Sequence, residues 1–248
     1  MLKKTQPYSK LATIYDFVMK HVNYTRWHTY ILEACRRYDV TPDRILEVAC
    51  GTGTVTQLLS DQGHNVTGLD LCYGMLARAR EKNGASVPLA QGNMAALPFK
   101  GRFDLIICLY DSINYLLEKE EITAFLQDAA ALVRPDGLLI FDICTEFNSL
   151  HYFLDIMDTD SGDDFYFERR SRYRKKDHIQ ENKFKLYLRE GKKLMKYKEE
   201  HRQRIYQTDT IETLIDSTGK YTFESFDGFT FKAPTFNTTR IHYMLRLK

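Results

Sequence analysis

Short apolar runs alternate with helical patterns over residues 43–142, and this alternation constrains the fold more than any other feature. The apolar runs predict strands at 45–49, 65–69, 87–91, 103–109 and 138–142. Helical spacing of apolar residues predicts helices over 54–62, 74–82 and 120–133. Strands separated by helices form βαβ units with right-handed crossovers, so we predict an α/β fold around a mostly parallel sheet. Residues 134–137, with the sequence RPDG, predict a turn before the last of these strands.

The flanking segments have other patterns. Residues 8–38 are predicted to be helical with a break near 22–24, and polar and apolar side chains alternate as in antiparallel strands over 165–175, 178–189 and 193–206. A helix over 208–217, capped by Thr208 or Asp209, precedes final strands at 221–231 and 238–247. We therefore expect three parts, which are a helical cap over 1–40, an α/β domain made of 41–148 and 207–248, and an antiparallel insert over 149–206 that forms a lid on the substrate side.

Composition argues against several classes of protein. The 248-residue chain has a formal net charge of +2, so the total charge does not argue for a nucleic-acid partner. No apolar run reaches the length of a membrane span, and the N-terminus lacks the apolar segment of a secretory signal. The five cysteines are widely spaced without a C-x-x-C pair, which argues against a disulfide framework, a zinc ribbon or an iron–sulfur cluster and favours the reducing cytoplasm.

The most informative motif is a strand that carries an acid and ends in a glycine turn. The stretch ILEVACGTGTVTQLL, residues 45–59, places Glu47 four residues before Gly51, and Gly53 precedes a helix. A Gly-x-Gly turn lets backbone N–H groups approach a ligand, and the helix N-terminus adds its positive end. Dinucleotide-binding motifs add a third glycine, but Thr56 stands at that position. Glu47 would repel a phosphate and attract an ammonium, which favours S-adenosylmethionine (SAM).

Three later segments place polar residues after predicted strands. Asp70 ends the second strand, where a carboxylate accepts hydrogen bonds from both hydroxyls of a ribose. The segment QGNMAALPF, residues 91–99, offers polar and apolar side chains to an adenine ring after the third strand. The apolar run FDLIICL opens into YDSINYL, residues 110–116, and in an open α/β sheet the ligand lies at this end of the strands.

These four segments, in this order, resemble those of the class I SAM-dependent methyltransferases. The likeness is greatest to small bacterial and archaeal members with an N-terminal segment like Tyr15-Asp16, Tyr24 and Trp27 and a D-S-x-N-Y segment, here residues 111–115. It implies a Rossmann-like fold, in which a mostly parallel seven-stranded sheet has an antiparallel last strand and carries an antiparallel lid. It also implies transfer of a methyl group from SAM, which leaves S-adenosylhomocysteine (SAH), to a nucleophilic N, O or C atom, with no metal.

The resemblance, together with the positions of polar residues after the predicted strands, indicates the site residues. Those expected to bind the cofactor are Tyr15, Trp27, Glu47, Ala49, Cys50, Gly51, Thr52, Gly53, Asp70, Leu71, Met75, Gly92, Asn93, Met94 and Leu109. Those expected to bind the acceptor are Tyr110, Asp111, Asn114 and Tyr115, and a general base, where one is used, is expected to be Asp111 or Tyr115. Many members have an aspartate in place of Asn93, whose side-chain oxygen still accepts from an adenine amino group.

Several assignments have structural alternatives. Asp70 would cap the following helix, Met75 would pack in the core, and Asn93 would form a turn. An NAD(P)-dependent oxidoreductase and a non-catalytic SAM-binding module are alternative functions.

The insert permits two interpretations. Residues 168–204 carry more Lys and Arg than Asp and Glu, so an RNA methyltransferase would use them to bind its substrate. The basic residues alternate with core positions, however, which favours a solvated lid whose many aromatic residues roof an apolar pocket for a small-molecule acceptor. The sequence does not determine the oligomeric state, and dimerisation through the insert is one option.

Overall fold

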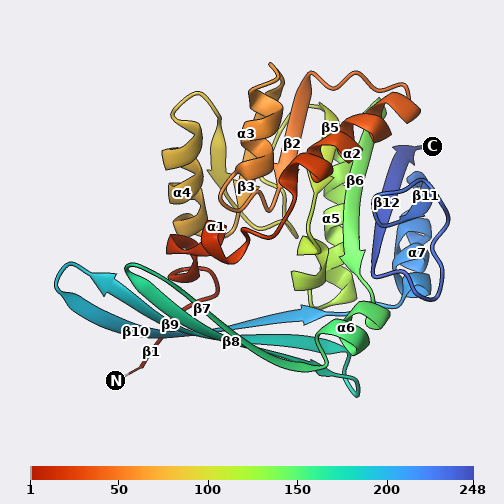
Figure 1. Ribbon diagram of the computed structural model, residues 1–248. Helices are drawn as coiled ribbons and strands as arrows, with labels where there is room; N and C mark the ends of the chain where they lie inside the picture. The colour runs from red at the N-terminus through yellow and green to blue at the C-terminus, as the bar shows by residue number, and fades with distance from the viewer. Residues whose placement is uncertain (1) are drawn as a thin grey trace.

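The protein, described by a computed structural model over residues 2–248, has two sheets (Figure 1). The larger sheet has the strand order β11-β12-β6-β5-β2-β3-β4. Its neighbouring strands are parallel except for β12, which is antiparallel to both β6 and β11. This confirms the predicted mostly parallel sheet with an antiparallel last strand. The strands are β2 (Arg44–Val48), β3 (Asn65–Asp70), β4 (Leu89–Gln91), β5 (Phe103–Cys108), β6 (Val133–Cys144), β11 (Tyr221–Asp227) and β12 (Arg240–Leu247).

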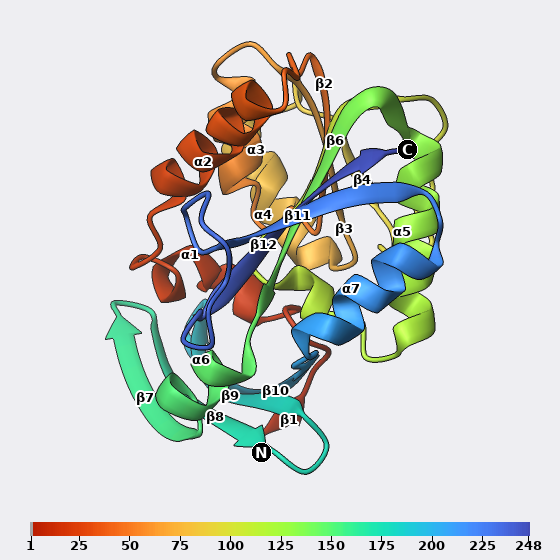
Figure 2. The same cartoon turned by 90° about the vertical axis from the view of Figure 1, so that its right-hand side faces the viewer.

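Helices cover both faces of this sheet, because successive strand residues point to opposite faces. In β2, Ile45 packs with α2 and α3, whereas Leu46 packs with α5 and α7. Figure 2 shows α2, α3 and α4 on one side of the sheet and α5 and α7 on the other. The helices are η1 (Leu11–Thr13), α1 (Tyr15–Val18), α2 (Tyr24–Arg37), α3 (Thr54–Ser60), α4 (Tyr73–Asn83), η2 (Ser112–Tyr115), α5 (Lys119–Leu132), α6 (Glu146–Tyr152) and α7 (Thr208–Ser217).

Some local predictions need correction. The predicted turn at 134–137 is wrong, because these residues belong to β6 and bulge between the pairs Phe103–Val133 and Leu105–Leu138. The N-cap of α7 is Gln207 rather than Thr208 or Asp209. Residues 8–38 contain three separate helical pieces, η1, α1 and α2, and helix α6 was not predicted.

The second sheet lies beneath the end of the larger sheet toward which the arrowhead of β6 points (Figure 1). Its order is β1-β10-β9-β8-β7, so the insert forms four strands rather than the three predicted. The strand β1 pairs parallel with β10 through Lys3 and Tyr197, which ties the N-terminal segment to the insert. The strands are β1 (Lys3–Lys4), β7 (Asp155–Gly162), β8 (Phe165–Arg174), β9 (Ile179–Glu190) and β10 (Lys193–Arg204).

The strand missed by prediction, β7, supplies acids to the basic insert. Antiparallel pairing brings Asp158 to 2.7 Å from Arg169, and Asp155 to 2.9 Å from Arg170. These pairs balance the charge of the acids of β7 along the edge of the sheet. Within the described residues, no helix is long and apolar enough to cross a membrane.

Candidate active site

A cavity of about 250 Å³ lies between the two sheets. Its walls come from the N-terminal segment, the turn after β2, the end of β5, and the strands β8, β9 and β10. The structure thus brings together segments that lie far apart in the sequence. Of the predicted site residues, those that line the cavity are Tyr15, Trp27, Glu47, Ala49, Cys50, Gly51, Thr52, Leu109, Tyr110, Asp111 and Tyr115.

The turn after β2 has left-handed backbone at alternate residues, with φ of 57° at Ala49, 56° at Gly51 and 71° at Gly53. A Cβ on Gly53 would lie 2.6 Å from the side chain of Asn83, so this glycine is required for packing between α3 and α4. A Cβ on Gly51 would meet no atom within 4 Å. Gly51 therefore leaves open space on the cavity wall, as a backbone that contacts a ligand does.

Glu47 is a buried carboxyl group on this wall, with 4% of its surface exposed. Thr56 donates its hydroxyl to one carboxylate oxygen. Burial raises the pKa of Glu47 to about 7, although the hydrogen bond from Thr56 opposes the rise. A cation placed in the cavity beside Glu47 would favour the ionised carboxylate.

Asp70 supports the same turn from behind. Its two carboxylate oxygens accept the backbone N–H of Gly51 at 2.9 Å and of Cys72 at 2.8 Å. Burial raises the pKa of Asp70, while these backbone hydrogen bonds oppose the rise. Asp70 does not line the cavity but lies next to the cavity wall at Gly51. The alternative prediction that Asp70 caps α4 is wrong, because the N-cap of that helix is Cys72. Asp70 braces the turn instead.

The other residues predicted to bind ribose and adenine also lie outside the cavity, at the ends of β3 and β4. Leu71 is 66% exposed, and Asn93 accepts the backbone N–H of Ala95 in a turn. A Cβ on Gly92 would lie 2.8 Å from Leu69, so packing accounts for that glycine. Met94 is half-buried, and Met75 is buried in the core as its alternative predicted. Their predicted contacts with a cofactor remain predictions.

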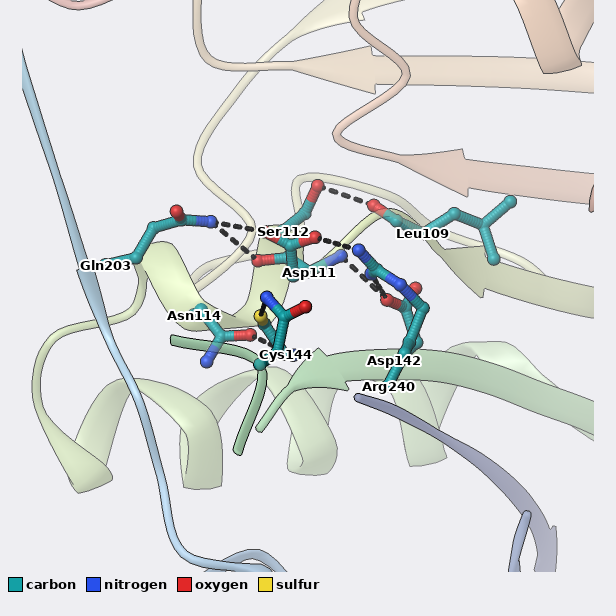
Figure 3. A network of polar contacts seen from close by, with 9 residues as sticks. Leu109, Asp111, Ser112, Asn114, Asp142, Cys144, Gln203 and Arg240 are labelled. Carbon is teal, nitrogen blue, oxygen red and sulfur yellow. Dashed lines mark hydrogen bonds and ion pairs between the residues drawn. The ribbon is translucent and has the colours of Figure 1, made fainter. Parts of the chain in front are cut away.

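A buried ionic network closes the end of β5 (Figure 3). Arg240 lies 2.6 Å from one oxygen of Asp111 and also pairs with Asp142. Gln203 donates to the other oxygen of Asp111 at 2.5 Å. Burial raises the pKa of Asp111, and Arg240 opposes the rise. Because both of its oxygens are already engaged, Asp111 is poorly placed to accept a proton from a substrate.

This network contains two carboxylates and one guanidinium, so it carries excess negative charge when both acids are ionised. The guanidinium of Arg240 also lies over two aromatic rings that line the cavity, 5.3 Å from the ring centre of Trp27 and 4.9 Å from that of Tyr110. The guanidinium thus packs against the aromatic wall, and the excess negative charge of the network favours cations in the cavity.

Asn114 has a structural position instead of the predicted contact with the acceptor. It is fully buried and does not line the cavity. Its side chain donates to the carbonyl of Arg204 at 2.6 Å and accepts the N–H of Cys144 at 3.0 Å, as Figure 3 shows in part. Asn114 thus joins η2 to β10 and β6.

The insert presents mainly polar side chains to the cavity, with Phe184 beside them, so the predicted apolar roof is present only in part. The polar residues come from alternate positions on three adjacent strands and are Arg169, Ser171, Gln180, Asn182, His201 and Gln203. The apolar positions Phe184, Leu186 and Leu188 pack mainly against Leu11 and Ile14 of the N-terminal segment. The prediction holds only in part because the same face of the insert is apolar at one end and polar at the other.

Comparisons with known proteins agree with this arrangement. Residues 45–137 match the family described as a methyltransferase domain. A putative methyltransferase of Geobacillus sp. (strain WCH70) is 29% identical over 244 residues, which cover 96% of this chain and 99% of that protein. The crystal structure of a SAM-dependent methyltransferase from Clostridium acetobutylicum ATCC 824 has a TM-score of 0.83 and 26% identity, covering 97% of this chain and 98% of that one. The chain belongs to the class I SAM-dependent methyltransferases.

A further relative of this methyltransferase has a named acceptor. The dTDP-3-amino-3,6-dideoxy-alpha-D-glucopyranose N,N-dimethyltransferase of Streptomyces fradiae is 35% identical over 135 residues, which cover 54% of this chain and 52% of that enzyme. Within the described part of the methyltransferase, no three His, Cys, Asp or Glu side chains gather where they would hold a metal ion.

Sequence reasoning missed several residues that line the methyltransferase cavity or lie directly behind its wall. Arg240 lines the cavity, and Asp142 lies behind it as the one charged residue in the apolar run 138–144, so that signal was available. The acid, imidazole and amide of Glu199, His201 and Gln203 occupy alternate positions of β10, so the period-two pattern indicated a polar inner face. Nothing in the sequence indicated that Tyr8 lines the cavity.

Proposed function

We propose that this methyltransferase moves the methyl group of SAM to a nitrogen or oxygen atom of a small, polar acceptor held between the end of β5 and the insert. One observation carries the proposal: a single cavity joins Glu47 and Gly51 to the polar side chains of Ser171, Asn182 and Gln203. SAM, when bound, supplies a methyl group on a sulfonium sulfur that leaves as a neutral thioether.

The cofactor side of the cavity has the chemistry that SAM needs. Glu47 would hold the ammonium of the methionine end, and the backbone at Gly51 would approach it without a Cβ in the way. Asp70 would accept from the ribose hydroxyls while bracing the turn. The exposed side chain of Leu71 and the loop of Asn93 would bracket the adenine.

The acceptor side favours a molecule with several hydrogen-bonding groups. Gln180 is 5% exposed, and it donates to the carbonyl of Phe153 at 3.1 Å. Its side-chain oxygen has no partner among the described residues. A buried amide oxygen of this kind is costly unless a ligand hydroxyl or amine donates to it. A polyhydroxylated amine, such as the amino sugar of the Streptomyces fradiae relative, has the donors that this wall lacks.

Electrostatics also favour a cationic or proton-releasing acceptor. The carboxyl groups of Glu47 and Asp111 line the cavity, and Asp142 lies behind Asp111. The single positive charge of Arg240 balances only one of these three carboxyl groups. The other nearby arginine, Arg169, is already paired with Asp158. The catalytic task of the chain is then to orient the acceptor and exclude water, because a sulfonium is already a good leaving group.

Ligand-dependent stability tests the cofactor. At concentrations of about 100 times their dissociation constants, SAM and SAH should stabilise the folded state by about 2.7 kcal/mol, which raises Tm by roughly 5–10 °C. ATP and NADH at the same concentrations should leave Tm unchanged. A shift with NADH and none with SAM would reject the proposal.

A labelling screen tests the acceptor. Methyl-labelled SAM is incubated with the protein and with three separate pools, which are amino sugars and small amines, folded RNA, and cell protein. Label should enter the small-molecule pool. Label confined to RNA or to protein would reject a small acceptor while keeping the methyltransferase activity.

A further inference from the structure

Four side chains form a continuous chain from the interior of the insert to the cavity. Glu199 and His201 stand on β10, Tyr115 ends η2, and Tyr8 lies in the N-terminal segment. Tyr8, Tyr115 and His201 line the cavity, and Glu199 lies behind them. The ionic network of Asp111 and Arg240 does not include these residues.

Glu199 is the fixed negative end of this chain. Its side chain is fully buried, and one oxygen accepts the backbone N–H of Lys10 at 2.6 Å and of Leu11 at 3.1 Å. Burial alone would raise the pKa of Glu199, but His201 and these two N–H groups outweigh it and lower the pKa. Glu199 is therefore a carboxylate that stays ionised.

His201 is held between this carboxylate and a tyrosine. Its Nε2 lies 3.3 Å from the second oxygen of Glu199, and its Nδ1 lies 3.4 Å from the hydroxyl of Tyr115. The rings of Tyr8 and Phe184 pack edge-on against the imidazole, with ring centres 4.5 Å and 5.3 Å away. In the tautomer with its proton on Nε2, beside the carboxylate of Glu199, the imidazole would leave Nδ1 to accept a proton from Tyr115.

The two tyrosines carry the chain into the cavity. Their hydroxyl oxygens lie 2.5 Å apart. Burial raises the pKa of both Tyr8 and Tyr115 well above the usual range, so each phenol keeps its proton and carries no charge at rest. Tyr8 has a φ of 64°, a backbone conformation that costs energy for a residue with a Cβ. Strain of this kind persists where surrounding contacts hold a residue in place.

We propose that Glu199, His201 and Tyr115 form the proton acceptor for the methyl-receiving group, an inference that rests on the proposed function. As the acceptor gives up its N–H or O–H proton, that proton moves to the hydroxyl oxygen of Tyr115. The proton of Tyr115 moves to Nδ1 of His201. Glu199 remains ionised and stabilises the imidazolium, so charge and protons balance.

The alternative is that Glu199 and His201 only tie η1 to the insert. Four ionisable groups act on the imidazole or its tyrosine partner, namely Glu199 on β10, Tyr8 in the N-terminal segment, and Asp111 and Asp70 beyond Tyr115. The variants must therefore keep the contacts between the N-terminal segment and the insert while removing the group that accepts the proton. Glu199→Gln keeps an oxygen for the backbone N–H groups, and His201→Asn keeps a polar side chain beside Tyr115. His151→Asn, at an exposed histidine of α6, is the matched control.

Turnover as a function of pH tests the step directly. The full chain is assayed with methyl-labelled SAM and two probes, dTDP-3-amino-3,6-dideoxyglucose and glucosamine. His201→Asn and Glu199→Gln should lower kcat about 100-fold at pH 7 while KM for SAM stays within about twofold. Roughly two pH units above the pKa of the acceptor amine, where the free amine needs no base, kcat of both variants should return to within about threefold of wild type. A loss that is equal at every pH would overturn the proposal.

A measurement without an acceptor separates this proposal from the proposed function. ¹⁵N NMR of the full chain at pH 8 should show His201 with its proton on Nε2 and with Nδ1 accepting a hydrogen bond that Tyr115→Phe removes. A proton on Nδ1 would overturn the relay even if methyl transfer is found. If neither probe is methylated while the tautomer is as expected, the amino-sugar acceptor is rejected and the relay stands.

Discussion

The two walls of the cavity are assembled in different ways. On the cofactor side, the contact that braces the turn joins Gly51 to Asp70 across 19 positions of sequence. On the acceptor side, Asp111 meets Arg240 across 129 positions, and Tyr115 meets His201 across 86. The first wall is a local motif that any member of the fold can reuse. The second is specific to the way this chain folds back on itself, so we expect acceptor choice to be determined there.

The largest expected effect comes from Arg240→Met. Removing the guanidinium leaves Asp111 and Asp142 buried without their cation, and breaking a buried pair in this way costs about 3–5 kcal/mol. Urea unfolding should show this loss in the free energy of unfolding. Arg246→Met on the same strand is the control, because Arg246 makes no ion pair among the described residues. A loss below about 1 kcal/mol would mean that the acceptor wall does not depend on its network.

Glu47→Gln probes the opposite wall through pH. The folded state raises the pKa of Glu47 from 4.5 to about 7, so it retains a proton that the unfolded chain releases between these values. Stability without SAM should therefore fall as pH rises through this window, by on the order of 2–3 kcal/mol. The variant should lose this slope and also bind SAM at least tenfold more weakly. The control is Glu33→Gln at an exposed position of α2. If the free energy of unfolding of wild type and Glu47→Gln depends on pH in the same way, the buried carboxyl group of Glu47 is not the cause of that dependence.

Asp70→Ala tests whether the turn-bracing residue also binds ribose. Each hydroxyl left without its acceptor costs on the order of 1–3 kcal/mol, so SAM affinity should fall at least tenfold in calorimetric titration. Asp70→Asn keeps one acceptor oxygen and should lose less. Asp61→Ala, at an exposed acid beyond α3, should behave as wild type. Unchanged SAM affinity in Asp70→Ala would mean that Asp70 only braces the turn and does not bind the ribose.

The smallest effect is expected on the outer surface of the insert. Replacing Arg170, Arg172, Lys175 and Lys176 together by Gln should leave methyl transfer within about twofold of wild type, because all four side chains face solvent. Wild-type binding to RNA between about 50 and 200 mM salt should be weak. Tight binding with a log–log salt slope of roughly −0.7 per contact, lost in the variant, would make RNA the leading acceptor.

The parts of the structure that could be predicted are those whose signal is local. Strands β2, β3, β5 and β6 are apolar on both faces, and Glu47, Gly51 and Gly53 stand within a few residues of one another. The strand β7 escaped prediction because its acids make sense only beside the arginines of β8. Asn114 has the residue type and the position of a ligand-binding group, yet two backbone partners occupy its side chain.

The pairs on the acceptor wall could not be predicted because strand register determines them. Whether His201 meets Tyr115 depends on how β10 lies under η2, and no spacing within either segment records that. A shift of β10 by a single residue would turn His201 to the outer face.

The two-residue strand β1 has a kinetic consequence. It holds the edge of the second sheet through Lys3 and Lys4, followed by one hydrogen bond from Thr5 to Lys198 at 3.0 Å. So short an edge opens at a small fraction of the cost of global unfolding. Tyr8 and Leu11 follow on the same segment and line the cavity, so fraying of this edge would loosen the segment on one side of them, while Glu199 still holds Lys10 and Leu11. We therefore expect this part of the cavity wall to open more easily than the wall built on the larger sheet, which offers a route for product release.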